Sequence, residues 1–190
     1  MLIDLIVSIE IIGMKPNVGS GDEGDTGLYG AGRVDKGALR VECCGDVDEL
    51  NSFIGLARAE LGNRFQDIDS ILFETQNKLF TLGADLASPN VSKIRLSKED
   101  VEFVENTINE LEKELTPLGK FILTGGTKAS ALLHITRTVC RRVERGIVSL
   151  SKVENVGEFT IPFANRLSDL FFTLARVVNK RLGVKEVEWR

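Results

Sequence analysis

The chain has 190 residues, of which 43% are apolar and 27% are charged, a composition typical of one globular domain with a sizeable core. Its net charge of −4 argues against a nucleic-acid-binding protein that depends on bulk positive charge. Three cysteines and a single histidine exclude a disulfide framework and a multi-histidine metal site, so we expect reduced thiols and a cytoplasmic protein.

Residues 1–13 are expected to form an N-terminal extension to one domain that spans residues 14–190. The extension is apolar, but it contains Asp4 and Glu10 and no basic residue, which does not fit a secretory signal. No run in the chain reaches the length of a transmembrane helix, so we expect no membrane contact. The sequence leaves open whether the extension is an edge strand, a loose arm or residues ahead of an internal start at Met14.

A glycine-rich loop is expected over about residues 14–45. Seven glycines lie between Gly19 and Gly37, and this spacing permits positive φ angles and close approach of backbone N–H groups to an anion. The pattern is neither a Walker A motif nor a Rossmann fingerprint. A flexible surface loop would explain it equally well, and Lys36 could add a phosphate contact.

Five later segments carry apolar residues at alternating steps of three and four, which predicts five helices. The expected helices span residues 46–61, 65–87, 97–115, 128–150 and 164–182. Asp46 is the expected N-cap of the first helix, and Ser97 with Asp100 forms a capping box at the third. No segment alternates long enough to predict a strand, so we expect an all-α bundle with near-antiparallel packing.

Four arginines fall within residues 137–145 of the fourth expected helix. Arg137, Arg141 and Arg145 form one stripe, and Arg142 lies about 100° further round. The buried face of this helix is expected to comprise Leu132, Ile135, Val139 and Val143. The stripe is either a solvated basic face or a clamp for a polyanion, because the forked guanidinium donors match phosphate oxygens.

Four further polar residues also have two interpretations. Asn165 is expected to open the last helix, either as a cap or as a phosphate contact. Asp46 and Asp48 begin the first helix, where they either favour its dipole or pair with an arginine. His134 is more typical of a structural than of a catalytic residue.

Four stretches together resemble the ATP:cob(I)alamin adenosyltransferases of the propanediol-utilisation type over about residues 15–181. They are Gly21 to Gly30, Gly45 to Asn51, Phe121 to His134, and Arg137 to Arg145 with Asn165 to Asp169. The resemblance implies a five-helix bundle with a ferritin-like four-helix core, assembled as a homotrimer with active sites between subunits. It implies transfer of the 5′-deoxyadenosyl group of ATP to cob(I)alamin, with Mg²⁺ accompanying the triphosphate.

The resemblance also implies roles for individual residues. Arg141 and Phe121 would act at the reaction centre, Phe121 at the corrin face, while Arg137 would pair with Asp48 across the subunit interface. The implied ATP contacts are Ser20, Gly21, Thr26, Gly27, Lys36, Arg141, Arg142, Glu144, Arg145 and Asn165. No metal ligand is identified, and a cobalamin reductase and a B12-dependent mutase are candidate partners.

The glycine loop departs from the family's usual Thr-Lys-Thr-Gly-Asp-Lys-Gly, because Gly19 and Glu23 replace the two lysines. Thr124 also stands where the family usually has proline. A non-catalytic helical module that binds nucleotide is therefore the alternative function. In the implied reaction the reduced cobalt is the nucleophile, so no Ser/His/Asp array or general base is required, and the sequence contains no pattern for one.

Overall fold

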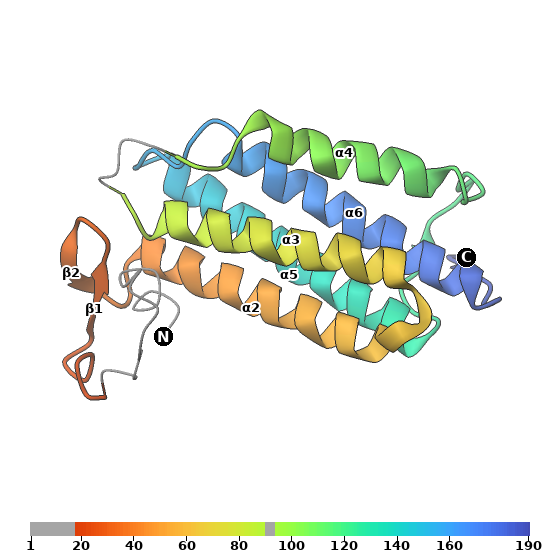
Figure 1. Ribbon diagram of the computed structural model, residues 1–190, viewed down its shortest axis with the longest axis horizontal. Helices are drawn as coiled ribbons and strands as arrows, with labels where there is room; N and C mark the ends of the chain where they lie inside the picture. The colour runs from red at the N-terminus through yellow and green to blue at the C-terminus, as the bar shows by residue number, and fades with distance from the viewer. Residues whose placement is uncertain (1–17, 90–93) are drawn as a thin grey trace.

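The computed structural model describes residues 18–89 and 94–190, so the expected extension of residues 1–13 lies outside the described residues. Helices form most of this part of the chain, and five long ones lie roughly side by side as a bundle (Figure 1). They are α2 (Leu39–Leu61), α3 (Gln66–Leu86), α4 (Lys98–Glu112), α5 (Lys128–Ser151) and α6 (Thr160–Arg181). The expected all-α bundle is confirmed.

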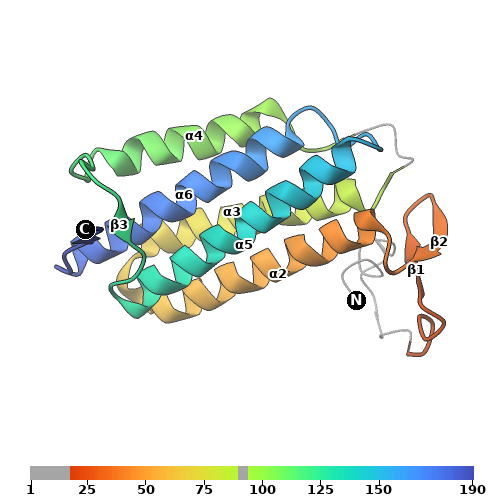
Figure 2. The same cartoon turned by 180° about the vertical axis from the view of Figure 1, so that it is seen from behind.

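Helix α5 lies at the centre of the packing, because it contacts both α6 and α2. Helix α4 packs on α6, and α3 packs on α2, as the view from behind also shows (Figure 2). The apolar positions expected on three helices are fully or almost fully buried, and full burial of a Leu or Ile side chain is worth about 1.5–3 kcal/mol. They are Val47, Leu50, Ile54, Ala57 and Leu61 on α2, Ile68, Leu72, Leu79, Leu82 and Leu86 on α3, and Leu167, Leu170, Leu174 and Val177 on α6.

The first helix begins at Leu39, so the expectation that Asp46 is its N-cap is wrong. The added turns are held by Arg40, which is only 4% exposed. Its Nη1 donates to the carbonyl oxygen of Leu86 at 2.7 Å, and its Nε donates to the carboxylate of Glu154 at 2.7 Å. Tertiary contacts therefore extend a helix into a segment whose local sequence resembles a loop.

The last helix begins at Thr160, so Asn165 lies inside it and does not open it. Pro162 occupies the first turn, where a residue without an N–H group removes no helical hydrogen bond. The capping box of α4 is confirmed, because the Asp100 carboxylate accepts from the Ser97 N–H at 2.9 Å.

Two short antiparallel strand pairs were not expected from the sequence. Strand β1 (Asp25–Leu28) pairs with β2 (Gly32–Asp35), and β3 (Ile122–Leu123) pairs with β4 (Val187–Glu188). Segments of two to four residues are too short to show a periodic pattern. The β1–β2 hairpin lies at the end of the bundle where α2 begins, and β3 lies at the opposite end (Figure 2).

The buried face of α5 differs in part from the expected one. Val139 and Val143 are buried, but Ile135 is 43% exposed and Leu132 is only partly buried. The buried positions of α5 instead include Leu133, Thr136 and Cys140. Thr136 can be buried because its hydroxyl donates a hydrogen bond to the carbonyl of Leu132 at 2.9 Å.

None of the helices in residues 18–89 and 94–190 is long and apolar enough to cross a membrane.

Candidate functional site

The arginine stripe of α5 runs from a partly buried end to an exposed one. Arg137 is half-buried, whereas Arg141 and Arg145 are exposed. The guanidinium of Arg145 donates to the backbone carbonyl of Arg141 at 2.9 Å, and no hydrogen bond or ion pair joins the Arg141 side chain to the described residues. Burial, and then the nearby charge of Arg141, lower the pKa of Arg137. Like charges held close together without carboxylate partners are typical of a site that awaits an anion.

Arg142 points towards α2 rather than along the stripe. Its Nε donates to Asp46 at 3.1 Å, and its Nη2 pairs with Glu49. One of the expected roles of Asp46, pairing with an arginine of the cluster, is therefore present within one chain. Because these two carboxylates already balance its charge, the role of Arg142 as an ATP contact stays a prediction.

Asn165 is held beside the arginine stripe by a side-chain network between α5 and α6. Its amide donates to the carboxylate of Glu144 at 2.8 Å, and its carbonyl oxygen accepts from Arg166 at 2.7 Å. Arg166 is fixed in turn by Glu105 on α4 at 2.9 Å. The structure thus brings together two of the expected ATP contacts, Glu144 and Asn165.

A cavity of about 950 Å³ lies beside Arg137 at the β3 end of the bundle. Phe121 is 80% exposed, and Trp189 from the C-terminal segment is 62% exposed. The Arg137 guanidinium lies 6.0 Å from the centre of the Phe172 ring, within range of a cation–π interaction. The cavity is lined by Leu118, Gly119, Lys120, Phe121, Ile122, Thr124, Arg137, Phe172, Trp189 and Arg190.

The loop that carries Phe121 is anchored at both of its ends. The backbone N–H of Trp189 donates to the carbonyl of Phe121 at 2.8 Å. Further along, the side chain of Asn179 bridges the Gly125 carbonyl and the Thr127 N–H, both at 2.9 Å. Gly126 has φ +104° and packs so closely on Asn179 that a Cβ there would lie 2.4 Å from the amide. Glycine is therefore required at Gly126.

The expected pair between Asp48 and Arg137 is not formed within one chain. No ion pair involving Asp48 occurs among the described residues, and the buried Nε of Arg137 has no hydrogen-bond partner there. The predicted pair spans two subunits, so it stays a prediction. His134 is 5% exposed, and burial, together with the charge of Arg137, lowers its pKa to about 4, so it remains neutral near pH 7.

The glycine-rich loop contains a β-hairpin, formed by β1 and β2, and is not an irregular connection throughout. Thr26 and Gly27 lie in β1, and the Tyr29 N–H donates to the Ala87 carbonyl at 2.9 Å, which ties the hairpin to the end of α3. Lys36 donates to the carbonyl of Gly21 at 2.6 Å. No hydrogen bond or ion pair within the described residues joins the loop contacts Ser20, Gly21, Thr26, Gly27 and Lys36 to the arginines of α5.

Sequence reasoning missed Phe172, Trp189, Asn179 and Arg176. Arg176 is 8% exposed and binds Glu186 at 2.7 Å and the Thr116 carbonyl at 2.8 Å, so it ties the C-terminal segment to the loop before β3. Its guanidinium also lies 5.9 Å from the Phe172 ring. A buried arginine near an exposed tail has no distinctive sequence pattern, whereas the Gly125–Gly126 pair could have indicated a close backbone contact.

Comparison with known proteins identifies relatives over almost the whole chain. A corrinoid adenosyltransferase from Bacillus subtilis is 49% identical over 179 residues, which is 93% of this chain and 92% of the relative. A cobalamin adenosyltransferase from Cupriavidus metallidurans is 41% identical over 171 residues, 90% of this chain and 91% of the relative.

The chain is also similar to solved structures of proteins of the same kind. A variant of the PduO-type ATP:corrinoid adenosyltransferase from Lactobacillus reuteri, complexed with cobalamin and ATP, superposes with a TM-score of 0.88 at 33% identity. The match covers 93% of this chain and 97% of that one. The model of the cobalamin adenosyltransferase family matches residues 17–178, and the chain belongs to this family.

Proposed function

We propose that the protein transfers the 5′-deoxyadenosyl group of ATP to the cobalt of cob(I)alamin and forms adenosylcobalamin. Co(I) attacks the 5′ carbon of the ribose with its electron pair, a cobalt–carbon bond forms, and the bond to the 5′ oxygen breaks. Triphosphate leaves with the bonding electrons, and the cobalt is formally oxidised to Co(III). Because the cobalt is the nucleophile, the protein needs no general base.

One observation carries the proposal: Arg137 belongs both to the arginine stripe and to the wall of the cavity. Arg141 and Arg145 follow it on α5, and the stripe from residue 137 to 145 is about 12 Å long at 1.5 Å per residue. An exposed cationic stripe that ends at a largely apolar cavity suits a reaction between a nucleoside triphosphate and a large, flat macrocycle.

The proposed roles follow from the chemistry of the side chains. Arg141 and Arg145 bind the triphosphate and stabilise the negative charge that develops on it as it leaves. Glu144 and Asn165, already joined by a hydrogen bond, contact the nucleotide beside them. Phe121 covers one face of the corrin and excludes water from it, which leaves the cobalt free to attack ATP from the other face.

Mg²⁺ and the trimer belong to the same proposal. The described residues contain no group of three or more His, Cys, Asp or Glu side chains that could hold a metal ion. Mg²⁺ commonly binds through phosphate oxygens and one or two carboxylates, so we expect it to be bound with ATP and to reduce the charge of the triphosphate. The β1–β2 hairpin lies at the opposite end of one subunit from β3, which directly follows Phe121 (Figure 2), and this favours a site completed by a second subunit of a homotrimer.

The proposal is tested by mixing the protein with ATP, Mg²⁺ and chemically reduced cobalamin and following the absorption spectrum of adenosylcobalamin. Triphosphate should appear in equal amount and only when the corrinoid is present. A non-catalytic nucleotide-binding module would bind ATP without forming either product.

We also propose a cytoplasmic location, with a cobalamin reductase as the source of Co(I) and a B12-dependent mutase as the acceptor of the product.

A further inference from the structure

Arg33 on β2 reaches back to the glycine-rich segment that precedes β1. Its Nε donates to Asp25 Oδ2 at 2.6 Å, and its Nη2 donates to Asp25 Oδ1 and to the backbone carbonyl of Ser20. Arg33 pairs in register with Gly27, so the side chain of Asp25, two residues away on β1, points to the same face. Gly27 has no side chain that could block this path.

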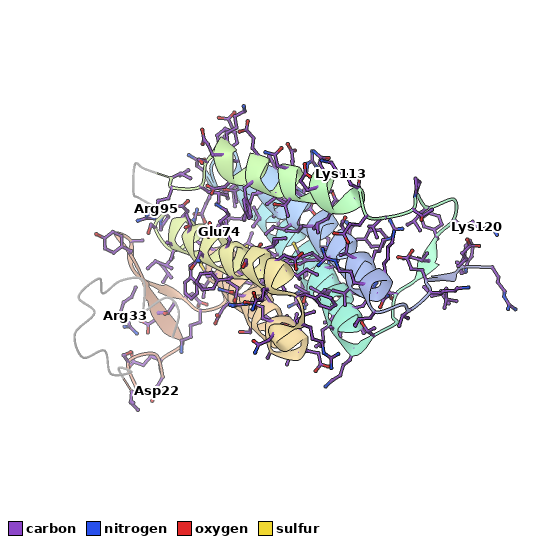
Figure 3. All side chains as sticks on the ribbon, turned by 45° about the vertical axis from the view of Figure 1, so that its right-hand side comes forward. Asp22, Arg33, Glu74, Arg95, Lys113 and Lys120 are labelled. Atoms are coloured by element: carbon purple, nitrogen blue, oxygen red, sulfur yellow. The ribbon has the colours of Figure 1, made fainter. Side chains whose placement is uncertain are left out.

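A second cation holds the next carbonyl of the same segment. Lys36 Nζ donates to the Gly21 carbonyl at 2.6 Å, and the Lys36 N–H donates to the Gly24 carbonyl at 2.9 Å. Figure 3 shows Arg33 and Asp22 together at this end of the molecule, far from Lys120 at the other end. Residues 20–25 are therefore shaped by contacts with β2 and the residue that follows it.

The carbonyl of Ser20 and the N–H of Gly21 belong to the same peptide unit. In a trans peptide these two groups point in opposite directions. Because the carbonyl is turned towards Arg33, the Gly21 N–H is turned away from it, and this N–H donates no hydrogen bond within the described residues. An outward N–H group in a glycine-rich turn is a ready ligand for a phosphate oxygen.

The charge of the loop makes the contact with Asp25 as important as the contact with Ser20. Asp22, Glu23 and Asp25 would all repel a triphosphate, and Gly19 and Glu23 stand where the family usually has lysine. The guanidinium of Arg33 forms a bidentate pair with Asp25 and holds the pKa of that carboxyl below its usual range, so the pair is close to neutral.

We propose that Arg33 is a positioning residue for ATP: it fixes the Ser20–Gly21 peptide with the Gly21 N–H outward and neutralises Asp25 beside the phosphates. This inference rests on the proposed function, in that the glycine loop is taken to bind ATP. Arg33 does not itself touch the reacting atoms. Its loss should therefore weaken the capture of ATP and leave the chemical step intact once ATP is bound.

The test compares Arg33→Gln with a matched control, Arg58→Gln. Arg58 forms the same kind of bidentate pair, with Asp69 at 2.7 and 3.0 Å, but near the opposite end of α2 from the hairpin. We expect Arg33→Gln to raise KM for ATP about ten-fold, as befits the loss of charge-assisted hydrogen bonds, and to leave kcat and KM for cob(I)alamin within about two-fold. Arg58→Gln should leave KM for ATP unchanged.

Two further variants separate shape from charge. Arg33→Lys keeps the charge without the fork, so KM for ATP should fall between wild type and Arg33→Gln. Adding Asp25→Asn to Arg33→Gln removes the exposed carboxylate and should recover part of the affinity for ATP. If the double variant is no better than Arg33→Gln, neutralisation of Asp25 is not part of the role.

Calorimetric titration of the same proteins with ATP and Mg²⁺, without corrinoid, keeps this test separate from the proposed activity. A wild-type protein that binds ATP but makes no adenosylcobalamin would refute the proposed function, and Arg33→Gln would still be compared with Arg58→Gln for ATP affinity. The inference about Arg33 is overturned if Arg33→Gln binds ATP as wild type does. It is also overturned if both KM values and the thermal midpoint worsen together, because that pattern would mean general loss of structure.

Discussion

Truncation of Phe121 separates a ligand-facing role from a packing role. The sequence allows both, because Phe121 begins an apolar run, but the structure leaves the residue 80% exposed, so the idea that it is a core residue is wrong. Phe→Ala at a fully buried position costs about 3–5 kcal/mol, so with a fifth of the residue buried we expect about 1 kcal/mol or less. In a chain of this length that lowers the thermal midpoint by no more than about 2–4 °C.

The effect on function should be much larger than the effect on stability. Full burial of a Phe side chain is worth about 1.5–3 kcal/mol, and four-fifths of it is still available for a ligand in the cavity. If the corrin covers this surface, Phe121→Ala loses about 1–2.5 kcal/mol, or about 5–70-fold in kcat/KM for cob(I)alamin. ATP affinity should hardly change, because Arg141 and Arg145, the proposed triphosphate ligands, do not line the cavity.

Thermal midpoint, ATP affinity and turnover are measured on one sample of Phe121→Ala. The matched control is Leu123→Ala, because Leu123 is 56% exposed on the adjacent strand β3 but does not line the cavity. This control should keep normal turnover. Unchanged turnover per folded Phe121→Ala protein would refute the corrin-facing role, and an equal loss in both variants would refute the reasoning from the cavity.

Arg141→Ala should lower kcat/KM for ATP at least about ten-fold, because a charge-assisted hydrogen bond to phosphate is worth about 1.5–3 kcal/mol. The thermal midpoint should stay unchanged, because Arg141 is exposed. Turnover close to that of wild type would contradict the phosphate role. Asp48→Asn and Arg137→Ala should each reduce turnover, and the double variant should lose little more than either single one; additive losses would show that the two side chains do not interact. Sedimentation should give the mass of a trimer, and a monomer at micromolar concentration, with or without ATP, would refute the shared site.

The buried faces of the helices could be predicted from the sequence because they depend only on the local spacing of apolar residues. The steps between Val47, Leu50 and Ile54 already place these residues on one face of α2, and all three are fully buried. The start of α2 could not be predicted in the same way. Its first turns are held by Arg40 through Leu86 and Glu154, which are distant in sequence, so no local pattern contains the signal.

The members of the candidate site could be predicted more easily than their partners. Spacing alone places Arg137, Arg141 and Arg145 in one stripe, but not which arginine a carboxylate neutralises. That depends on how α2 packs on α5, which brings Asp46 to Arg142 and leaves Arg141 exposed. Likewise, the cavity depends on Phe172 of α6 and on Trp189, and Trp189 comes close to Phe121 only when the C-terminal segment folds back and β4 pairs with β3.

Unsatisfied polar atoms give a physical reason to expect a second subunit at this site. Among the described residues, Asn51 Oδ1, His134 Nδ1 and Arg137 Nε are buried without a hydrogen-bond partner, and all three lie on α2 or α5, which pack against each other. Each such group costs about 1–3 kcal/mol, and a charged one costs more. A carboxylate brought to the Arg137 guanidinium from outside the chain would recover the largest of these costs. We propose that a neighbouring copy supplies Asp48, which lies on α2 and forms no ion pair among the described residues, and the same contact would fix Arg137 between the stripe and the cavity.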